Sequence, residues 1–335
     1  MNCAAKAPRP SSLPASTAMF IWRRCASASS RHVNFNSNLY FQIMAETPLI
    51  STPMRDYETL SRPSFTMPAL ACDAHMHVFG PEDKYPKVEH PHYTLPDGKL
   101  AHYLQMMSVL QLKRFVIVQP SFYGTDNRCL IDALHVAGSI ARGVVMIDEG
   151  TDAATLDSFH QAGVRAVRLD LFARSGLPTA EIQQYITRMA RLCASLGWHV
   201  QFYAPGWVVR NLIPFLADVQ TDFVIDHMGY MLEEDGLTQA DFDRLLSLLK
   251  DGNCWLKLSA PYRIAKHRGY EAVAPMAEAI IKAAPQKVIW GSDWPHIPDS
   301  TRDTGELLNL LGAWTGDLAV HKMILADNPA RLFDY

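Results

Sequence analysis

Eight short apolar runs, each followed by a segment with a helical pattern, constrain this chain more than any other feature of its sequence. The runs lie at 69–73, 114–119, 143–147, 166–171, 199–203, 223–226, 255–258 and 288–290. Between them lie amphipathic stretches of helical length, such as 181–196, 240–250 and 271–284. Eight nearly continuous apolar strands with intervening helices are typical of a closed parallel barrel of about 250 residues. We therefore predict an α/β fold, a single-domain (β/α)8 TIM barrel over 69–335.

A doubly wound open sheet is the alternative to the barrel. Such sheets bind phosphates at a glycine-rich loop after a strand, and no loop of this kind follows any of the eight runs. The segment 78–98 follows the first run and is rich in proline, glycine and histidine. We expect it to form a long loop that covers the mouth of the barrel.

Composition is that of a soluble globular protein and argues against a nucleic-acid partner. Of the 335 residues, 48% are hydrophobic and 19% are charged, and the formal net charge is −3. Residues 1–45 hold five basic and no acidic residues, which leaves 26 basic and 34 acidic residues in the rest of the chain. An acidic balance does not suit a polyanion. No apolar run approaches the roughly 20 residues that span a bilayer, so we expect no membrane association.

The first 45 residues differ from the rest of the chain. They are rich in Ser, Ala and Arg, a composition that resembles a mitochondrial transit peptide. Two other interpretations stay open: Met44 is the initiator, or 38–42 are most of a tag-removal protease site. We expect a disordered or targeting segment over 1–45 and an extended lead-in over 46–68. Six scattered cysteines without a Cys-x-x-Cys pair indicate an intracellular protein, cytoplasmic or mitochondrial.

Polar residues gather where the predicted strands end, which is where the active sites of such barrels lie. His75 and His77 follow the first run, and residues two apart on a strand point the same way, so both imidazoles face one side. The other candidates, in chain order, are Gln119, Ser121, Arg168, Asp170, Arg174, Tyr203, Asp226, His227, the segment 259–263 that ends in Arg263, Asp293 and His296.

Each of these residues has an ordinary structural explanation when taken alone. His227 suits a buried core histidine, Asp293 a turn or helix cap, and Arg263 a solvated loop. Arg168 is less ordinary because a guanidinium inside an apolar strand needs an anionic partner, and Asp170 on the same face is the candidate. The joint order of His-x-His on the first strand, His after the sixth and Asp after the eighth indicates an active site.

Five motifs stand at or near the predicted strands, and a sixth lies at 328–333. They are Asp-Ala-His-Met-His-Val-Phe-Gly, Val-Ile-Val-Gln-Pro-Ser-x-Tyr-Gly-Thr-Asp-Asn, Arg-Ala-Val-Arg, Val-Ile-Asp-His-Met-Gly, Trp-Gly-Ser-Asp-Trp-Pro and Asn-Pro-Ala-Arg-Leu-Phe. With this set the chain resembles the amidohydrolase superfamily over about 69–335, in the branch that contains 2-pyrone-4,6-dicarboxylate hydrolase and sugar-acid lactonases. The resemblance implies a barrel enzyme that opens a lactone.

Most members of that superfamily hold a divalent metal with the histidines of the first strand, a histidine of the fifth and the aspartate of the eighth. Here Tyr203 stands at the fifth-strand position, and His199 lies at the opposite end of that strand, about 13 Å away at ~3.3 Å per residue. Arg168 and Asp170 replace the carbamylated lysine of binuclear members, and an arginine repels a metal. We therefore expect no cofactor. If zinc does bind, the predicted ligands are His75, His77 and Asp293, with His296 as a further candidate.

The resemblance also implies roles for the site residues. His75, His77 and His227 polarise the lactone carbonyl by hydrogen bonds. Asp293 takes a proton from water and returns it to the leaving oxygen, for which the site must raise the pKa of this carboxyl or deliver its driving force in the transition state. The predicted substrate-binding residues are Tyr203, Arg168, Arg174, Arg263 and Ser121.

The arginines indicate a small anionic lactone as substrate, because their planar forks bind carboxylates through two parallel hydrogen bonds. Asp170 departs from the family, where a neutral asparagine is expected, and leaves the exact dicarboxylate open.

We predict a metal-independent hydrolase of 2-pyrone-4,6-dicarboxylate or a similar lactone of aromatic-compound catabolism. The alternatives are a zinc-dependent hydrolase or decarboxylase of the superfamily, a sugar-acid lactonase or lactone isomerase, and a non-catalytic barrel that binds carboxylated ligands. The sequence does not indicate the oligomeric state.

Overall fold

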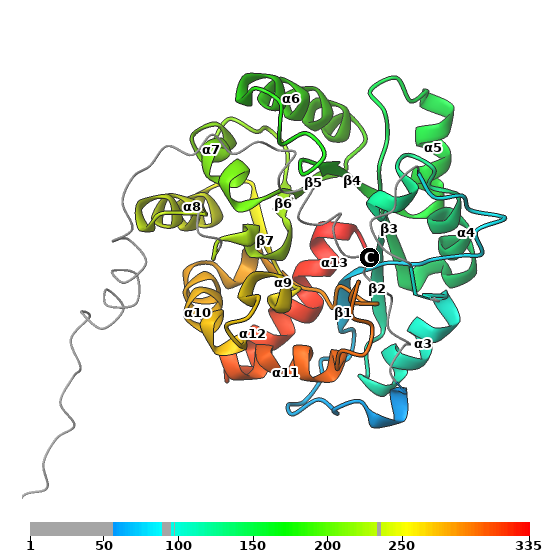
Figure 1. Ribbon diagram of the computed structural model, residues 1–335, viewed down its shortest axis with the longest axis vertical. Helices are drawn as coiled ribbons and strands as arrows, with labels where there is room; N and C mark the ends of the chain where they lie inside the picture. Colours follow the sequence, from blue (N-terminus) through cyan, green and yellow to red (C-terminus); the bar gives the residue numbers. More distant parts are fainter. Residues whose placement is uncertain (1–55, 89–94, 97, 233–235) are drawn as a thin grey trace, which may run out of the picture. The chain divides into compact units, whose positions relative to one another are not determined.

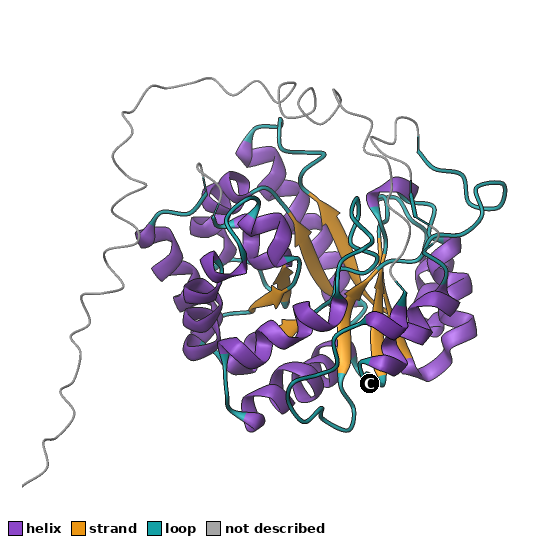
Figure 2. Ribbon diagram, turned by 60° about the horizontal axis from the view of Figure 1, so that its bottom comes forward, coloured by secondary structure: helices purple, strands orange, loops and turns teal. Residues whose placement is uncertain are grey.

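Eight parallel strands follow one another in chain order around the barrel, as the alternation of the sequence predicts (Figures 1 and 2). The computed structural model describes residues 56–88, 95–96, 98–232 and 236–335, all within one compact unit, Ser37–Tyr335. The strands are β1 (Cys72–Met76), β2 (Arg114–Val118), β3 (Ala141–Val145), β4 (Val164–Asp170), β5 (His199–Tyr203), β6 (Phe223–Ile225), β7 (Cys254–Leu258) and β8 (Val288–Trp290). The predicted (β/α)8 TIM barrel is confirmed.

Helices surround these strands in an outer layer (Figure 2). The described helices are α3 (Leu100–Val109), α4 (Arg128–Ala137), α5 (Ala153–Ala162), α6 (Thr179–Ser195), α7 (Gly206–Leu216), α8 (Gln239–Asp251), α9 (Pro261–Ala265), α10 (Ala274–Ala283), α11 (Thr304–Trp314), α12 (Leu318–Lys322) and α13 (Asn328–Phe333), of which α13 is not part of that layer. Their apolar residues recur at helical spacing, as in α6, where Ile182, Tyr185, Ile186 and Met189 are buried. A capping box between Thr238 and Asp241 fixes the start of α8.

Short turns of 3-10 helix connect several of these elements, and one π turn precedes α13. They are η1 (Tyr57–Thr59), η2 (Ser121–Tyr123), η3 (Gly138–Ile140), η4 (Asp226–Tyr230), η5 (Tyr270–Ala272), η6 (Pro285–Lys287) and η7 (Met323–Asp327). η2 and η4 directly follow β2 and β6, so they lie at the carboxyl ends of the strands, where the site residues are expected.

The barrel closes where β1 meets the segment that follows β8. Met76 and Trp294 form a parallel bridge, and the main-chain N–H of His77 donates to the carbonyl of Trp294 over 2.9 Å. Side chains reinforce this seam: the hydroxyl of Ser292 donates to the carboxylate of Asp73 over 2.5 Å, across 219 residues of sequence. The first and last strands of the barrel are therefore joined next to the predicted site.

Apolar side chains fill the lower part of the barrel interior. Cys72, Ala74, Trp255 and Ile289 belong to this cluster, and Phe333 of α13 packs into it with no exposed surface. Figure 1 shows α13, drawn in red, at the centre of the ring of strands. Because side chains fill this floor, the open end of the barrel is the carboxyl end of the strands.

The first strand begins three residues later than predicted. Residues 69–71 do not extend β1: the N–H of Ala71 donates to the carbonyl of Pro68 in a turn, and Leu70 is 49% exposed. An exposed apolar residue in a turn is read as strand when only the apolar pattern is considered. The shift brings His75 into the strand itself. The third strand likewise begins and ends two residues before its predicted bounds.

The lead-in and the long first loop are described in part. Ser61 and Ser64 of the lead-in bond to Asp303 and Asn309 at α11, whereas 1–55 lie outside the described residues, so the predicted targeting segment stays a prediction. In the first loop, the N–H of Val88 donates to the carbonyl of Phe122, beside the end of β2. Residues 89–94 and 97 of that loop also lie outside the described residues.

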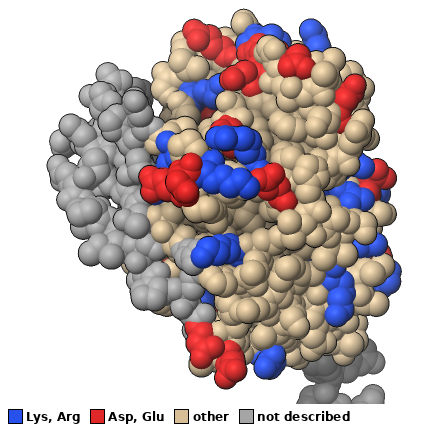
Figure 3. All heavy atoms as spheres, turned by 90° about the vertical axis from the view of Figure 1, so that its right-hand side faces the viewer, with Lys and Arg blue, Asp and Glu red and all other residues tan. Residues whose placement is uncertain are grey.

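Two further findings concern the surface and the helices. Figure 3 shows Lys and Arg interspersed with Asp and Glu on one face of the described chain, without a continuous basic stripe on that face. Among the described helices, none combines the length and the apolar character needed to cross a membrane.

Candidate active site

Three imidazoles and one carboxylate meet at the carboxyl end of the strands. Oδ1 of Asp293 lies 3.5 Å from Nε2 of His75, 3.4 Å from Nε2 of His77 and 3.8 Å from Nε2 of His227. All four residues are buried. Within the described part of the chain, this oxygen accepts no hydrogen bond. The structure thus brings together the four residues predicted to be catalytic, and leaves one carboxylate oxygen free for a proton.

The other oxygen of Asp293 is held by residues at the start of α9. The Tyr262 hydroxyl and Nε of Arg263 both donate to Oδ2, the latter over 2.8 Å, and Arg263 also donates to the carbonyl of Ile297. Burial raises the pKa of Asp293, but the Arg263 guanidinium and the neighbouring His227 lower it, and the balance lies well below 3.8. The carboxylate is therefore ionised, so its basicity is not tuned upward in the free site.

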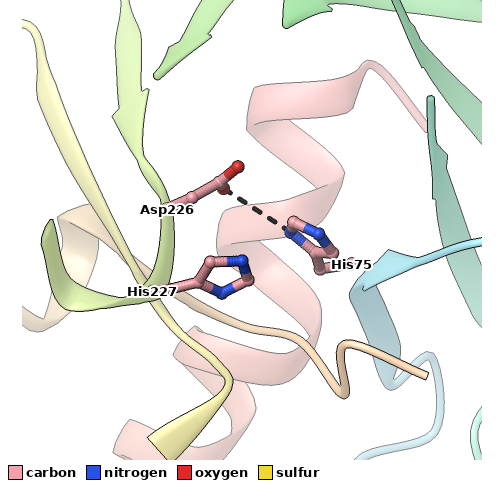
Figure 4. A group of neighbouring side chains, drawn as sticks. All are labelled: His75, Asp226 and His227. Carbon is pink, nitrogen blue, oxygen red and sulfur yellow. Dashed lines mark ion pairs between the residues drawn. The ribbon is translucent and has the colours of Figure 1, made fainter. Parts of the chain in front are cut away.

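A second polar layer lies directly beneath the histidines. Nζ of Lys257 lies 2.9 Å from Oδ1 of Asp226 and 3.1 Å from Nδ1 of His75, and Nε2 of Gln201 donates to Oδ2 of Asp226 over 2.9 Å. Figure 4 shows the Asp226 carboxylate directed at His75, with His227 beside them. Burial lowers the pKa of Lys257, and the Asp226 carboxylate opposes that shift. This layer places both a lysine nitrogen and a carboxylate oxygen within reach of Nδ1 of His75.

Hydrogen-bond polarity runs in one direction through the histidine pair. A lysine ammonium only donates, so its contact with Nδ1 of His75 favours the tautomer with the ring proton on Nε2. Nε2 of His77 lies 3.3 Å away, and Nδ1 of His77 is 2.8 Å from the carbonyl of Val118, which only accepts. These contacts are compatible with one direction, in which Lys257 donates to His75, His75 to His77, and His77 to the carbonyl of Val118.

Left-handed backbone orients several site residues. His227, Asp293 and Ala260 have φ of 51°, 60° and 47°, values that are uncommon outside glycine. Each such residue costs about 1–3 kcal/mol, and this strain persists only where the surrounding structure imposes it. His227 is held in this conformation by the bond between its Nδ1 and the Ser259 hydroxyl, over 2.8 Å. Two of these residues, His227 and Asp293, carry side chains of the site, and Ala260 forms the turn that leads into α9.

Arg168 lies beside the histidines but without the anionic partner predicted for it. Its guanidinium stacks 4.2 Å from the ring centre of Tyr203 and donates to the carbonyl of Gln119 over 2.8 Å. The Asp170 carboxylate instead accepts from the Ser121 hydroxyl over 2.5 Å and from the N–H of Ala173. Among the described residues, Arg168 forms no ion pair and its Nε has no hydrogen-bond acceptor. The predicted pairing of Arg168 with Asp170 is therefore wrong.

The side chains of three other residues named from the sequence contact residues outside the group of His75, His77, His227 and Asp293. Arg174 is half-buried and lies over the ring of Tyr185 on α6, at 4.2 Å. Nε2 of His296 is within 2.8 Å of the Thr304 hydroxyl, which does not direct it at the candidate zinc ligands. His199 packs against Phe333 at the floor of the barrel, as expected from its place at the far end of β5.

Three residues of the site were not singled out from the sequence: Lys257, Tyr262 and Gln201, which donates to Asp226 from within β5. Lys257 interrupts the apolar strand β7 just as Arg168 interrupts β4, so the same signal was present. Tyr262 lies in the segment 259–263 named as a strand end, but nothing in its spacing reveals the contact with Asp293.

The distances among three of these side chains suit a divalent metal. Ligand atoms of His75, His77 and Asp293 lie 3.3–3.5 Å apart. A tetrahedral zinc ion with bonds near 2.0–2.1 Å separates its ligand atoms by about 3.3 Å. The donor set does not fit, because a metal needs the lone pair on Nε2 of His75, where the contact with Lys257 places the proton. A ligating histidine also normally donates its other N–H to an acceptor, not to an ammonium.

The model of one family, Amidohydrolase, matches residues 72–335. The chain belongs to the amidohydrolase family. The membership and hydrolase class predicted from the motifs are thereby confirmed. This amidohydrolase is 33% identical to 2-pyrone-4,6-dicarboxylate hydrolase of Comamonas testosteroni over 291 residues, 83% of this chain and 94% of the relative. It is 35% identical to 4-sulfomuconolactone hydrolase of Rhizobium radiobacter over 276 residues, 81% of this chain and 92% of the relative.

A solved structure shares the fold of this amidohydrolase. It is that of a probable 2-pyrone-4,6-dicarboxylic acid hydrolase of Acinetobacter baumannii with citric acid bound, with a TM-score of 0.68 and 28% identity. The match covers 79% of this chain and 99% of the other.

Proposed function

We propose that this amidohydrolase opens the ring of a carboxylated lactone, of the class of 2-pyrone-4,6-dicarboxylate, without a metal. The observation that carries this proposal is the convergence of three imidazoles on the free Oδ1 of Asp293. Relatives named for hydrolysis of a pyrone dicarboxylate and of a sulfomuconolactone support the lactone as substrate class.

The site residues divide the reaction between them. The Nε2–H of His75 donates to His77 in the free site and turns to the lactone carbonyl oxygen when substrate binds, where, assisted by His227, it stabilises the developing oxyanion. This change frees the lone pair on Nε2 of His77. A water molecule is held by Nε2 of His77 and loses its proton to Oδ1 of Asp293 as its oxygen attacks the carbonyl carbon. The ring C–O bond then breaks, and Asp293 returns the proton to the leaving oxygen.

This division refines the roles that the resemblance implied for the histidines. His77 donates from Nδ1 to Val118, so its neutral ring has a lone pair, not a proton, on Nε2. An accepting nitrogen suits water better than a carbonyl oxygen. Because the pKa of Asp293 is held low, its driving force as a base arises in the transition state, where the attacking water becomes acidic.

Positive charge at the mouth supports an anionic substrate. Arg168 has an unpartnered Nε and no ion pair among the described residues, and Arg263 is anchored by its Nε and one terminal nitrogen. The remaining nitrogens of these guanidinium groups are available to substrate carboxylates. Bound citric acid in the Acinetobacter structure is a carboxylated ligand on the same fold.

The zinc-dependent alternative rests on the spacing of His75, His77 and Asp293. Two cationic side chains support the metal-independent mechanism. Lys257 contacts Nδ1 of His75, and the Arg263 guanidinium pairs with Asp293, so both candidate ligands already have a cation as partner.

Ring opening of 2-pyrone-4,6-dicarboxylate by chelator-treated protein tests the proposal, with zinc measured on the same sample. We expect loss of the absorbance of the conjugated ring at full rate without zinc, and none with Asp293→Asn. Activity that returns only with zinc would support the zinc-dependent alternative. No turnover of this compound or of a panel of sugar-acid lactones would contradict lactone hydrolysis altogether.

A further inference from the structure

Lys257 is a fully buried lysine in the middle of an apolar strand. Its exposed fraction is 0%, and its neighbours in β7 are Trp255, Leu256 and Leu258. Burial of an ammonium is costly unless the charge is paired and hydrogen-bonded. Asp226 provides the pairing at 2.9 Å. The same ammonium also reaches His75, at 3.1 Å, so the ion pair does more than balance its own charges.

The Asp226 carboxylate is an alternative partner for the same nitrogen of His75. Its Oδ1 lies 3.5 Å from Nδ1, farther than the lysine. The two partners have opposite effects on the ring: an ammonium requires a lone pair on Nδ1, whereas a carboxylate attracts a proton to Nδ1. In a neutral imidazole the other nitrogen takes the opposite state. The chemistry of Nε2, which faces Asp293 and His77, is therefore decided at Nδ1.

We propose that Lys257 is a positioning residue that holds His75 in the Nε2–H tautomer, which makes it a donor toward substrate and denies zinc a ligand. Lys257 acts through His75 and does not touch substrate. With Lys257 removed, Asp226 replaces it as the partner of Nδ1. The ring proton of His75 then moves to Nδ1, which leaves a lone pair on Nε2. His75, His77 and Asp293 then form a zinc site of the carboxylate–histidine–metal type, with Asp226 behind His75.

The wild-type protein provides the first test. Long-range proton–nitrogen spectra of protein labelled with 15N-histidine distinguish the two tautomers, and comparison with His75→Gln assigns the signal. We expect the Nε2–H form for His75. The Nδ1–H form in the wild type would overturn the proposal outright. This measurement needs no substrate, so its failure is distinct from failure of the proposed lactone hydrolysis.

Zinc affinity of Lys257→Met provides the second test. We expect this variant to show the Nδ1–H tautomer and to bind zinc about 10- to 100-fold more tightly than the wild type, the usual effect of a carboxylate behind a ligating histidine. Lys287→Met is the matched control, because Lys287 also pairs with an aspartate, Asp222, but contacts none of the site residues. We expect the control to bind zinc as the wild type does. Equal zinc affinity in Lys257→Met and the wild type would contradict the proposal.

A double variant covers the case in which Lys257→Met does not fold because Asp226 is left unpaired. In Lys257→Met with Asp226→Asn, Gln201 continues to donate to the amide oxygen, as it does to Oδ2 now, which turns the amide N–H toward Nδ1 of His75. We expect the Nε2–H tautomer and the weak zinc binding of the wild type to return. Tight zinc binding by this double variant would show that charge alone, not the donor to Nδ1, excludes the metal, and would overturn the proposal.

Discussion

Nε of Arg263 donates to Oδ2 of Asp293 over 2.8 Å, so a residue predicted to bind substrate is also the counter-ion of the predicted base. The two functions are compatible because they use different nitrogens of one guanidinium. The pair ties the acidity of the carboxylate to a residue of α9. Changes at Arg263 should therefore alter pH dependence as well as substrate binding.

We expect Arg263→Met to move the acid limb of the kcat/KM profile to higher pH. Arg263 lowers the pKa of Asp293, and without it burial raises that pKa, so protonation inactivates the base at a less acidic pH. KM for an anionic lactone should rise as well. Rates measured between pH 3 and 8 check this, with Arg263→Lys as the control that keeps the charge. An unmoved acid limb would contradict the assignment of Asp293 as the base.

Asp293→Asn should lower kcat by about 10²–10⁴-fold, the usual contribution of a general base. Tyr262→Phe removes one donor to Oδ2 but keeps the carboxylate, so a loss of about tenfold or less is expected. Steady-state kinetics on both variants, with thermal unfolding to confirm folding, provide the measurement. Wild-type kcat in Asp293→Asn would refute the mechanism.

Asp170→Asn should tighten the binding of doubly charged ligands about tenfold, because it removes a negative charge near the arginines. The asparagine oxygen can still accept from Ser121 and from the N–H of Ala173, so the loop keeps its hydrogen bonds. Calorimetry with a dicarboxylate and with a monocarboxylate of similar size separates charge from shape. Equal affinities in variant and wild type would mean that Asp170 does not face the substrate.

His199→Leu should reduce the loss of stability in acid. Burial, and then the nearby Lys257, lower the pKa of His199 from 6.5 to about 3. Between these values the unfolded state binds the extra proton, so the free energy of unfolding falls as the pH falls, on the order of 5 kcal/mol over the whole range for this group. Thermal unfolding from pH 8 to pH 4 should show a shallower decline in the variant. The same decline in both proteins would contradict a buried neutral His199.

The alternation of apolar runs with amphipathic stretches was sufficient to predict the barrel, because each strand is buried on both faces and each helix on one. The meeting of His75, His77, His227 and Asp293 was predicted for a related reason. The carboxyl ends of the strands of a barrel converge, whatever the conformation of the loops. Lys257 carried the same signal as Arg168, a charge within an apolar strand, and was open to the same argument.

Side-chain partners at the strand ends and in the loops were not predictable from spacing. Arg168 and Asp170 do share a face of β4. However, the ring of Tyr203 lies against the Arg168 guanidinium, and the Ser121 hydroxyl donates to the Asp170 carboxylate. The contact of Arg263 with Asp293 depends on the left-handed turn at Ala260 before α9. Such contacts are decided by packing between elements distant in sequence, which no local pattern records.

The seam between β1 and the segment after β8 also determines when the site forms during folding. Synthesis delivers His75 and His77 early and Asp293 late, and until the last strand arrives one edge of β1 has no partner. Pairing across this length of chain is slow, and an unpaired strand edge is prone to aggregate. Recovery of activity during refolding therefore reports the closing step itself, because the base reaches the histidines only when the ring of strands is complete.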